Sequence, residues 1–381
     1  MSAAARPRIL YVVTEDWYFL SHRLPMARAA RDAGFEVHVA TNVADGEAPI
    51  RAEGFVPHRA HFKRGRLAPL ASLSTIRALR RLYRDVKPNL IHHVAVQPVG
   101  LGSIAAAGLR IPCVNAVTGL GYAFIANSAR ARAVRWLLVA ALRVLLSRGN
   151  SVVLVQNEDD RRLLAEQGLD PARTTLIPGS GIDVVGLTPL PEPPEPITVA
   201  FVGRLLRHKG IRAVMAAHAA LRARGSNIKL LIAGTPDPAN PASLTENEVS
   251  ELSRMPGVSC LGHVRDIASV WARAHIAVLP SWHEGMPKSL LEAAACGRPM
   301  VASDAAGCRE VVRPGETGIL VPVEDANSLA AAIETLAASP ELRARYGSAA
   351  RRLAVERFSA DAIGHQTVDL YRRLVSLPGH S

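Results

Sequence analysis

Short apolar runs alternate with amphipathic stretches along most of this chain. In the first half, the runs at 8–13, 36–40 and 90–94 have the length of buried strands, and the stretches at 24–34 and 70–86 have the spacing of helices with one apolar face. Further strands are expected at 112–117 and 151–156, and a further helix at 100–109. Strands separated by helices predict a parallel sheet that is covered on both faces.

A proline-rich segment at 189–196 interrupts this pattern. It holds five prolines within eight residues, and proline at that density cannot continue a helix or a central strand. We interpret the segment as a semi-rigid linker between two domains. Behind it the pattern restarts, with strands expected at 197–203, 229–233, 258–261, 276–280 and 299–302, and helices at 211–224, 266–274, 287–296 and 360–375.

The sequence therefore predicts two doubly wound α/β domains. We expect the first domain at 1–188, the linker at 189–196, the second domain at 197–358, and a C-terminal helix within 359–381 that packs back toward the first domain. Parallel α/β sheets bind ligands beyond the carboxyl ends of their strands. We therefore expect the ligand site in a cleft between the two domains.

Composition narrows the class of protein. The four cysteines, Cys113, Cys260, Cys296 and Cys308, form no CxxC pair and have no histidine cluster beside them, which favours reduced core thiols over a disulfide framework or a zinc site. No apolar run approaches the ~18 residues of a membrane span, and residues 1–7 lack the apolar core of a signal peptide. We therefore expect a soluble, cytoplasmic protein.

The positive charge is confined to the first part of the chain. Residues 1–150 hold 21 lysine and arginine residues against 8 acidic residues, a net charge of +13, whereas the remainder holds 24 against 25. Such asymmetry suggests a polyanionic partner: membrane phospholipid, a diphosphate-linked acceptor or nucleic acid. The segment 61–66 (HFKRGR) and a basic amphipathic helix expected at 130–148 suit an anionic membrane surface. Solvated helix faces in an arginine-rich chain, or a core helix with arginines at its ends, are the alternatives.

The densest candidate chemistry lies in the segment 281–297 (SWHEGMPKSLLEAAACG). Glu284 and Glu292 are eight residues apart, and Pro287 suits the first position of the helix that carries Glu292. A helix N-terminus presents unpaired N–H groups and partial positive charge, which suits a phosphate. The two carboxylates would accept hydrogen bonds from ribose and hexose hydroxyls on either side. Taken alone, the spacing also fits a helix cap with two surface glutamates.

A second segment, 201–210 (FVGRLLRHKG), adds fixed positive charge. Its expected strand ends at Gly203, Arg204 follows directly, and Lys209 precedes the next helix. Both cations can reach beyond the strand ends, where they would neutralise a diphosphate without a metal. The sequence shows no acidic cluster suited to Mg²⁺, so we expect no metal and no cofactor.

Together with LGHVRD (261–266) and GETGILVPVED (315–325), these segments resemble the retaining GT-B glycosyltransferases of family 4 over the whole second domain. The stretches at 14–41 and 115–124 resemble, more loosely, the branch that builds bacterial surface polysaccharides and lipid-linked oligosaccharides. The resemblance implies a GT-B fold, in which two Rossmann-like domains face each other across a cleft. The first domain would bind the acceptor and the second the nucleotide sugar.

The resemblance also implies residue roles. Glu284 would hold hydroxyls of the donor sugar, while Arg204 and Lys209 would contact the donor diphosphate; these three are the expected catalytic residues. Glu292 would bind the ribose hydroxyls. The expected donor-binding residues are Glu292, Gly203, Gly285, Met286, Pro287, Lys288, Ser289, Leu290, Gly262, His263 and Val264.

The first domain departs from the family pattern in two places. Family members often carry a glycine-rich loop where this chain has 14–17 (TEDW), and many carry a histidine near Thr118, where this chain has none. The candidates for acceptor-side work are Asp16, His22, His93 and Thr118. Of the two neighbours His92 and His93, which follow a buried strand, one is expected to be structural.

We therefore expect a retaining transferase that moves a hexose or N-acetylhexosamine from a nucleotide diphosphate sugar, with UDP favoured by family frequency. Its acceptor would be a glycan or an undecaprenyl-type lipid diphosphate in bacterial surface polysaccharide synthesis, reached from the cytoplasmic face of the inner membrane. An anionic membrane surface is an expected partner and nucleic acid is not.

The alternatives are a nucleotide-sugar epimerase of the same fold, whose acid and base groups we cannot place, and a non-catalytic polyanion-binding protein, which would leave Glu284, Glu292 and the basic pair unexplained. A dehydrogenase would need GxGxxG after a first strand, which neither domain has.

Overall fold

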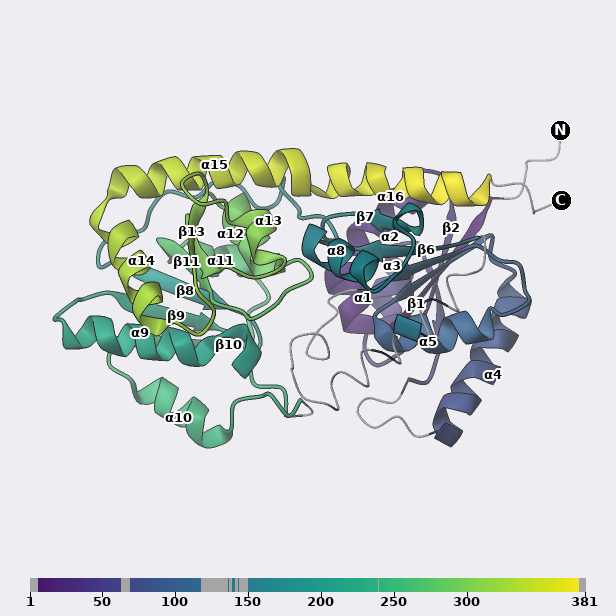
Figure 1. The fold of residues 1–381 in the computed structure, drawn as a ribbon, viewed down its shortest axis with the longest axis horizontal. Helices are drawn as coiled ribbons and strands as arrows, with labels where there is room; N and C mark the ends of the chain where they lie inside the picture. Colours follow the sequence, from purple (N-terminus) through teal and green to yellow (C-terminus); the bar gives the residue numbers. More distant parts are fainter. Residues whose placement is uncertain are drawn as a thin grey trace. The chain divides into compact units, whose positions relative to one another are not determined.

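The computed structural model describes residues 6–62, 69–117, 136, 139, 140, 143, 150–238 and 240–376. The chain divides into two compact units (Figure 1). Unit 1 comprises Met1–Gly181 and Ala360–Ser381, and unit 2 comprises Ile182–Ser359. Each unit is built around a single parallel sheet, as the alternation of strands and helices predicts.

Unit 1 contains a seven-stranded sheet in the order β3-β2-β1-β4-β5-β6-β7. Its strands are β1 (Arg8–Glu15), β2 (Glu36–Asn42), β3 (Val56–Arg59), β4 (Leu90–Val94), β5 (Cys113–Ala116), β6 (Ser151–Val155) and β7 (Thr174–Leu176). The helices are α1 (Asp16–His22), α2 (Leu24–Asp32), α3 (Glu47–Ala52), α4 (Pro69–Val86), α5 (Val96–Ala105), α8 (Glu158–Glu166) and α16 (Ala360–Val375), with a 3₁₀ turn, η1, at Pro171–Arg173.

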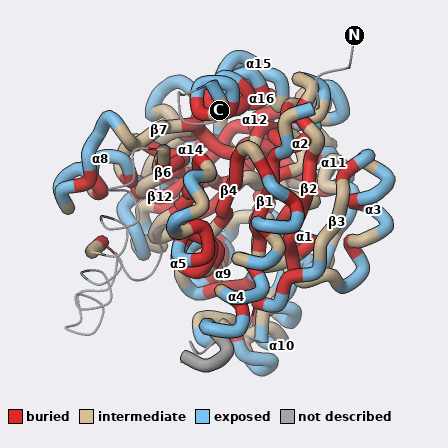
Figure 2. The backbone as a smooth tube through the Cα atoms, turned by 90° about the vertical axis from the view of Figure 1, so that its right-hand side faces the viewer, coloured by how far each residue is buried: buried red, intermediate tan, exposed pale blue. Residues whose placement is uncertain are grey.

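Strand β1 shows why this sheet is covered on both faces. Ile9, Tyr11 and Val13 enter one apolar cluster together with residues of α2 and α16. Leu10 and Val12 enter a second cluster together with residues of α4 and α5. Successive side chains of a strand point to opposite faces, so an unbroken apolar run requires a core on each side. Figure 2 shows β1 and β4 as buried strands with more exposed helices around them.

The C-terminal helix α16 belongs to unit 1. It packs on α2, where a Cβ added to Gly364 would lie 2.8 Å from the Cβ of Ala29. A buried hydrogen-bonded group joins α16 to the sheet: the hydroxyl of Tyr371 lies 2.8 Å from the hydroxyl of Tyr11 and 2.6 Å from Nδ1 of His92. Helix α16 therefore contributes both apolar and polar contacts to the core of unit 1.

Unit 2 contains a six-stranded sheet in the order β10-β9-β8-β11-β12-β13. Its strands are β8 (Thr198–Val202), β9 (Lys229–Ala233), β10 (Val258–Gly262), β11 (Ile276–Leu279), β12 (Met300–Ser303) and β13 (Gly318–Val321). Its helices are α9 (Ile211–Ala223), α10 (Glu246–Arg254), α11 (Ile267–Trp271), α12 (Lys288–Ala295), α13 (Cys308–Val311), α14 (Ala326–Ala338) and α15 (Pro340–Phe358), with a 3₁₀ turn, η2, at Arg207–Lys209. The strand order reverses between β8 and β11, and doubly wound sheets bind ligands at such a reversal.

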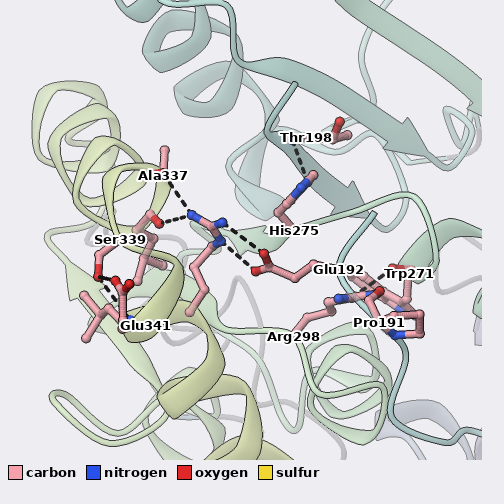
Figure 3. A network of polar contacts seen from close by, with 12 residues as sticks. Pro191, Glu192, Thr198, Trp271, His275, Arg298, Ala337, Ser339 and Glu341 are labelled. Carbon is pink, nitrogen blue, oxygen red and sulfur yellow. Dashed lines mark hydrogen bonds and ion pairs between the residues drawn. The ribbon is translucent and has the colours of Figure 1, made fainter. Parts of the chain in front are cut away.

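The proline-rich segment is part of unit 2, not a free linker between units. Arg298 donates to the carbonyl of Pro191 at 2.7 Å, and Glu192 accepts two hydrogen bonds from Arg343 of α15, at 2.7 and 3.0 Å (Figure 3). The N–H of Leu190 also donates to the carbonyl of Cys296 at 3.1 Å. These contacts fix the segment onto unit 2, so the chain leaves unit 1 at Gly181 and not after residue 188 as we expected.

None of the helices in the described ranges is long and apolar enough to cross a membrane.

Candidate active site

The loop after β8 carries the first two candidate residues. Beyond Val202 the chain passes Arg204, forms η2 and reaches Gly210, whose φ of 78° lies in the left-handed region. A Cβ at Gly210 would lie 2.0 Å from the carbonyl oxygen of Pro280, which follows β11. Only glycine fits there, and the close approach holds Lys209 beside the loop that follows β11.

That second loop, 280–287, is held by hydrogen bonds on two sides. The Ser281 hydroxyl and the N–H of Trp282 both donate to the carbonyl of His208, at 3.0 and 2.9 Å. On the other side, the N–H of Glu284 donates to the carbonyl of Ala306 at 3.1 Å. The backbone of Glu284 is therefore positioned by the loops that follow the neighbouring strands β8 and β12.

Lys209 and Glu284 form a close ion pair. The ammonium of Lys209 donates to both carboxylate oxygens of Glu284, at 2.5 and 2.6 Å. The two side chains keep only 20% and 9% of their exposure. Two residues that were singled out in separate motifs, 75 positions apart, are thus in direct contact. An anionic ligand that binds Lys209 would compete with Glu284 for this ammonium group.

Arg204 also has a carboxylate partner. Its Nη1 donates to Oδ2 of Asp237 at 2.8 Å, and half of the Arg204 side chain (49%) remains exposed. Our sequence analysis did not identify Asp237. It follows β9, whose carboxyl end lies beside that of β8, and a search for polar residues just beyond every expected strand would have found it.

Glu292 lies on α12, which begins at Lys288 with Pro287 as its N-cap. Pro287 is therefore one residue ahead of the first helical position in which we expected it. Burial raises the pKa of Glu292, although Lys288, with its ammonium 3.5 Å from Oε1, opposes this shift. Burial thus disfavours the charged form of this carboxylate, and a polar ligand that donates hydrogen bonds to it would offset that cost.

The other expected donor-binding residues follow the same edge of the sheet. Gly203 and the segment Gly285, Met286, Pro287, Lys288, Ser289 and Leu290 follow β8 and β11, while Gly262 ends β10 and is followed by His263 and Val264. Leu290 is buried in the core, so only its main chain is available to a ligand. All these residues therefore lie at or beyond the carboxyl ends of β8, β10 and β11, where a doubly wound unit binds its ligand.

The acceptor-side candidates differ in their surroundings. His93 is fully buried, with Nδ1 2.9 Å from Oδ1 of Asn115 and Nε2 3.1 Å from the hydroxyl of Tyr83. This burial lowers the pKa of His93 to about 4. The neighbouring His92 is buried as well, so both histidines contribute to the core of unit 1 and not one alone.

Asp16 holds backbone in place. Its Oδ2 accepts the N–H groups of Ala44 and Gly46, at 2.7 and 2.8 Å, and its Oδ1 accepts that of Trp17 at 2.7 Å. It thus fixes the loop after β2 to the start of α1, which follows β1 directly.

His22 is partly exposed and stacks on Tyr18 with ring centroids 4.4 Å apart. Thr118 lies outside the described residues, as do 63–66 of the first basic segment and all of 130–148 except 136, 139, 140 and 143.

The cysteines do not all lie in the core. Cys113, Cys296 and Cys308 are buried, but Cys260 is exposed on β10, at the edge of the sheet of unit 2. Burial raises the pKa of the Cys308 thiol to about 12, so it is not a nucleophile at neutral pH. Within the ranges that the structure describes, no group of three or more histidine, cysteine or acidic side chains is placed to hold a metal.

Both units match known families of glycosyltransferases. Residues 196–339 match the family described as "Glycosyl transferases group 1", and residues 8–157 match "Glycosyl transferase 4-like". The N,N'-diacetylbacillosaminyl-diphospho-undecaprenol alpha-1,3-N-acetylgalactosaminyltransferase of Campylobacter jejuni is 26% identical, over 94% of this chain and 98% of that protein.

Solved structures share the fold. Sucrose-phosphate synthase from Thermosynechococcus elongatus superposes with a TM-score of 0.83 at 23% identity, covering 97% of this chain and 99% of its own. HepE of Anabaena, crystallised with UDP and glucose, superposes with a TM-score of 0.76 at 18% identity, covering 97% and 99%. With matches in both units and similarity along nearly its whole length, this chain belongs to the family 4 glycosyltransferases and is a transferase enzyme of the GT-B fold.

Proposed function

We propose that this enzyme transfers a hexose or N-acetylhexosamine from a UDP-sugar, with retention of configuration, to a lipid-diphosphate-linked or glycan acceptor in bacterial surface polysaccharide synthesis. The observation that carries the proposal is the grouping of Lys209, Glu284 and Arg204 at the strand-order reversal of unit 2. The UDP and glucose bound to HepE, which has the same fold, support a UDP-sugar as the donor. The diphospho-undecaprenol named in the Campylobacter relative supports a lipid-linked acceptor.

In the proposed reaction the bond between the sugar C1 and the phosphate oxygen loosens first. Charge gathers on the leaving diphosphate, where Arg204, Lys209 and the N-terminus of α12 stabilise it. The acceptor hydroxyl forms the new bond to C1 on the same face, and its proton passes to the departing phosphate oxygen. No protein nucleophile and no metal take part.

Donor binding would rearrange the ion pair at the centre of this site. Lys209 exchanges Glu284 for a diphosphate oxygen, and Glu284 then accepts hydrogen bonds from sugar hydroxyls. Glu292 accepts hydrogen bonds from the ribose hydroxyls at the other side of the α12 N-terminus. Lys209 and Glu284, which neutralise each other when no donor is bound, would thus bind the diphosphate and the sugar hydroxyls of the donor.

A panel of nucleotide sugars tests the proposed donor. At ~100 times its dissociation constant, a donor stabilises the folded protein by about 2.7 kcal/mol. We expect one or more UDP-sugars to raise the melting temperature and to release UDP on incubation with the enzyme. A rise with GDP- or ADP-sugars alone would contradict the UDP assignment, and binding without any turnover would favour the polyanion-binding alternative.

We further propose that the basic first domain attaches to the anionic inner membrane, where a lipid-linked acceptor resides. The charge of +13 in residues 1–150 and the 69% exposure of Trp136 support this attachment. Each basic residue near an anionic surface contributes about 1 kcal/mol, and the attraction weakens with salt.

Vesicle co-sedimentation tests this attachment. We expect binding to anionic vesicles at low salt that is lost when Arg130, Arg132 and Arg135 are changed to glutamate. The control, which makes the same charge change in unit 2 at Arg212, Arg222 and Arg224, should bind as wild type does. Equal binding to neutral and anionic vesicles, or no binding to either, would refute the attachment and leave the transferase assignment intact.

A further inference from the structure

The loop that carries Asp237 is joined to the loop that carries Arg204 along its length. The N–H of Leu205 donates to the carbonyl of Thr235 at 3.0 Å, and the N–H of Arg207 donates to the carbonyl of Ala242 at 2.8 Å. Leu206 and Ser243 form an isolated antiparallel bridge. The loop after β9 therefore acts as a fixed support for the loop after β8.

Asp237 is itself held in place within this support. Its N–H donates to the hydroxyl of Ser243 at 2.9 Å, and its carbonyl accepts the N–H of Asn240 at 2.8 Å. Its side chain keeps 19% of its exposure, whereas that of Arg204 keeps 49%. In this pair the carboxylate is thus the anchored member, and it sets the position of the long and flexible arginine.

The contact uses only one edge of the guanidinium. Nη1 of Arg204 meets Oδ2 of Asp237, and no other hydrogen bond to this guanidinium is found among the described residues. A guanidinium carries five N–H donors in one plane, so an anion can bind along the edges that Asp237 does not occupy. A hydrogen-bond donor that is fixed before the reaction stabilises developing charge without the entropic cost of being ordered during the reaction.

We propose that Asp237 is a positioning residue for the transfer reaction: it holds Arg204 so that its remaining N–H groups face the diphosphate of the donor. The inference rests on the diphosphate role proposed for Arg204. It distinguishes the pair from an ordinary surface ion pair, whose removal has little effect. Loss of the Asp237 carboxylate near the diphosphate would by itself tighten the binding of UDP, because a negative charge is removed. A slower reaction without weaker UDP binding would therefore reflect the position of Arg204 and not the change in charge.

The test compares the variants Asp237→Asn, Asp237→Glu, Arg204→Ala and the double variant Asp237→Asn/Arg204→Ala with wild type. The control is Glu334→Gln, which removes the carboxylate of the exposed pair between Arg224, the C-cap of α9, and Glu334 of α14. UDP release is followed under single-turnover conditions, with the UDP-sugar that gives the largest thermal shift among UDP-glucose, UDP-galactose and their N-acetylhexosamine counterparts. The dissociation constant of UDP is measured by calorimetry.

We expect Asp237→Asn to slow UDP release about tenfold, while UDP binds within threefold of wild type or more tightly. Asp237→Glu should recover part of the rate, Glu334→Gln should match wild type, and Asp237→Asn should add no loss in the Arg204→Ala background. An unchanged rate in Asp237→Asn, together with a slowed Arg204→Ala, would overturn the positioning role alone. An unchanged rate in Arg204→Ala would overturn the proposed function of Arg204, whatever Asp237 does.

Discussion

Replacing Lys209 by methionine tests the central ion pair of the site. The change keeps the apolar stem of the side chain and removes its charge, which leaves the carboxylate of Glu284 largely buried without its ammonium partner. Removal of one member of a buried pair costs ~3–5 kcal/mol, because the other charge stays desolvated. The side chains here still keep 20% and 9% of their exposure, so we expect a loss somewhat below this range, ~2–3 kcal/mol.

Thermal unfolding measures this loss. For a domain of this size, 1 kcal/mol corresponds to ~2–4 °C in melting temperature, so Lys209→Met should melt ~5–10 °C below wild type. The double variant Lys209→Met/Glu284→Gln should recover most of the loss, because the desolvated charge of Glu284 is removed as well. Lys229→Met, which makes the same change at an exposed site at the start of β9, should melt close to wild type.

A melting temperature of Lys209→Met within 1 °C of wild type would show that the stability of the fold does not depend on the ion pair between Lys209 and Glu284. Failure of the double variant to recover would show that packing, and not charge, explains the loss. In either event UDP release by Lys209→Met separately reports whether the ammonium serves the reaction.

The remaining predictions concern Glu292, the metal-free reaction and His93. Glu292→Gln should weaken UDP binding roughly tenfold or more, since a hydrogen bond to a charged group contributes ~1.5–3 kcal/mol, and calorimetry measures it. Burial raises the pKa of Glu292 above its value in the unfolded chain, so ionisation of Glu292 destabilises the folded state as pH rises. Glu292→Gln should therefore melt at a higher temperature than wild type at pH 7 and lose this advantage in acid. A lower melting temperature of Glu292→Gln at pH 7 would contradict this prediction. Activity should survive EDTA, and strict dependence on Mg²⁺ or Mn²⁺ in the same assay would contradict the metal-free reaction. Burial lowers the pKa of His93 to about 4, so the stability that neutral His93 contributes is complete above its unfolded pKa and is lost as pH falls toward 4. In denaturant melts, His93→Gln should therefore lose less stability over that pH range than wild type. An identical pH profile of the two proteins would refute the prediction.

Much of the fold follows from simple apolar patterns. Strands β4 and β9 have the bounds that the sequence predicts. Strands β3, β7 and β13 did not stand out, since they are short and only partly buried. Helix α5 begins earlier than we expected, after Ala95, whose φ of 74° is a tertiary feature that local pattern does not predict.

The proline-rich segment shows where composition misleads. Proline density indicates that a segment is neither helix nor central strand, but it does not show what the segment packs against. Arg298 and Arg343 hold this segment on unit 2 from positions more than 100 residues later in the chain. No local sequence pattern predicts such long-range contacts.

The sequence suggested candidate residues for the site but not how they pair. Motif and resemblance identified Glu284, Lys209 and Arg204, and the structure adds which carboxylate meets which cation. Sequence alone does not give that pairing, because it depends on strand order and on the close approach at Gly210. Asp237 belongs to the same arrangement and lay outside every motif that we considered.

The most direct test of the proposed function is the product formed from a UDP-α-sugar and an undecaprenyl-type diphosphate-linked acceptor. Proton NMR of the first product follows both the release of UDP and the anomeric configuration of the new bond. The proposed function predicts UDP release with an α-configured product in the presence of EDTA, and loss of both in Lys209→Met. A β-configured first product, or no transfer from any nucleotide sugar to this or a glycan acceptor, would contradict it.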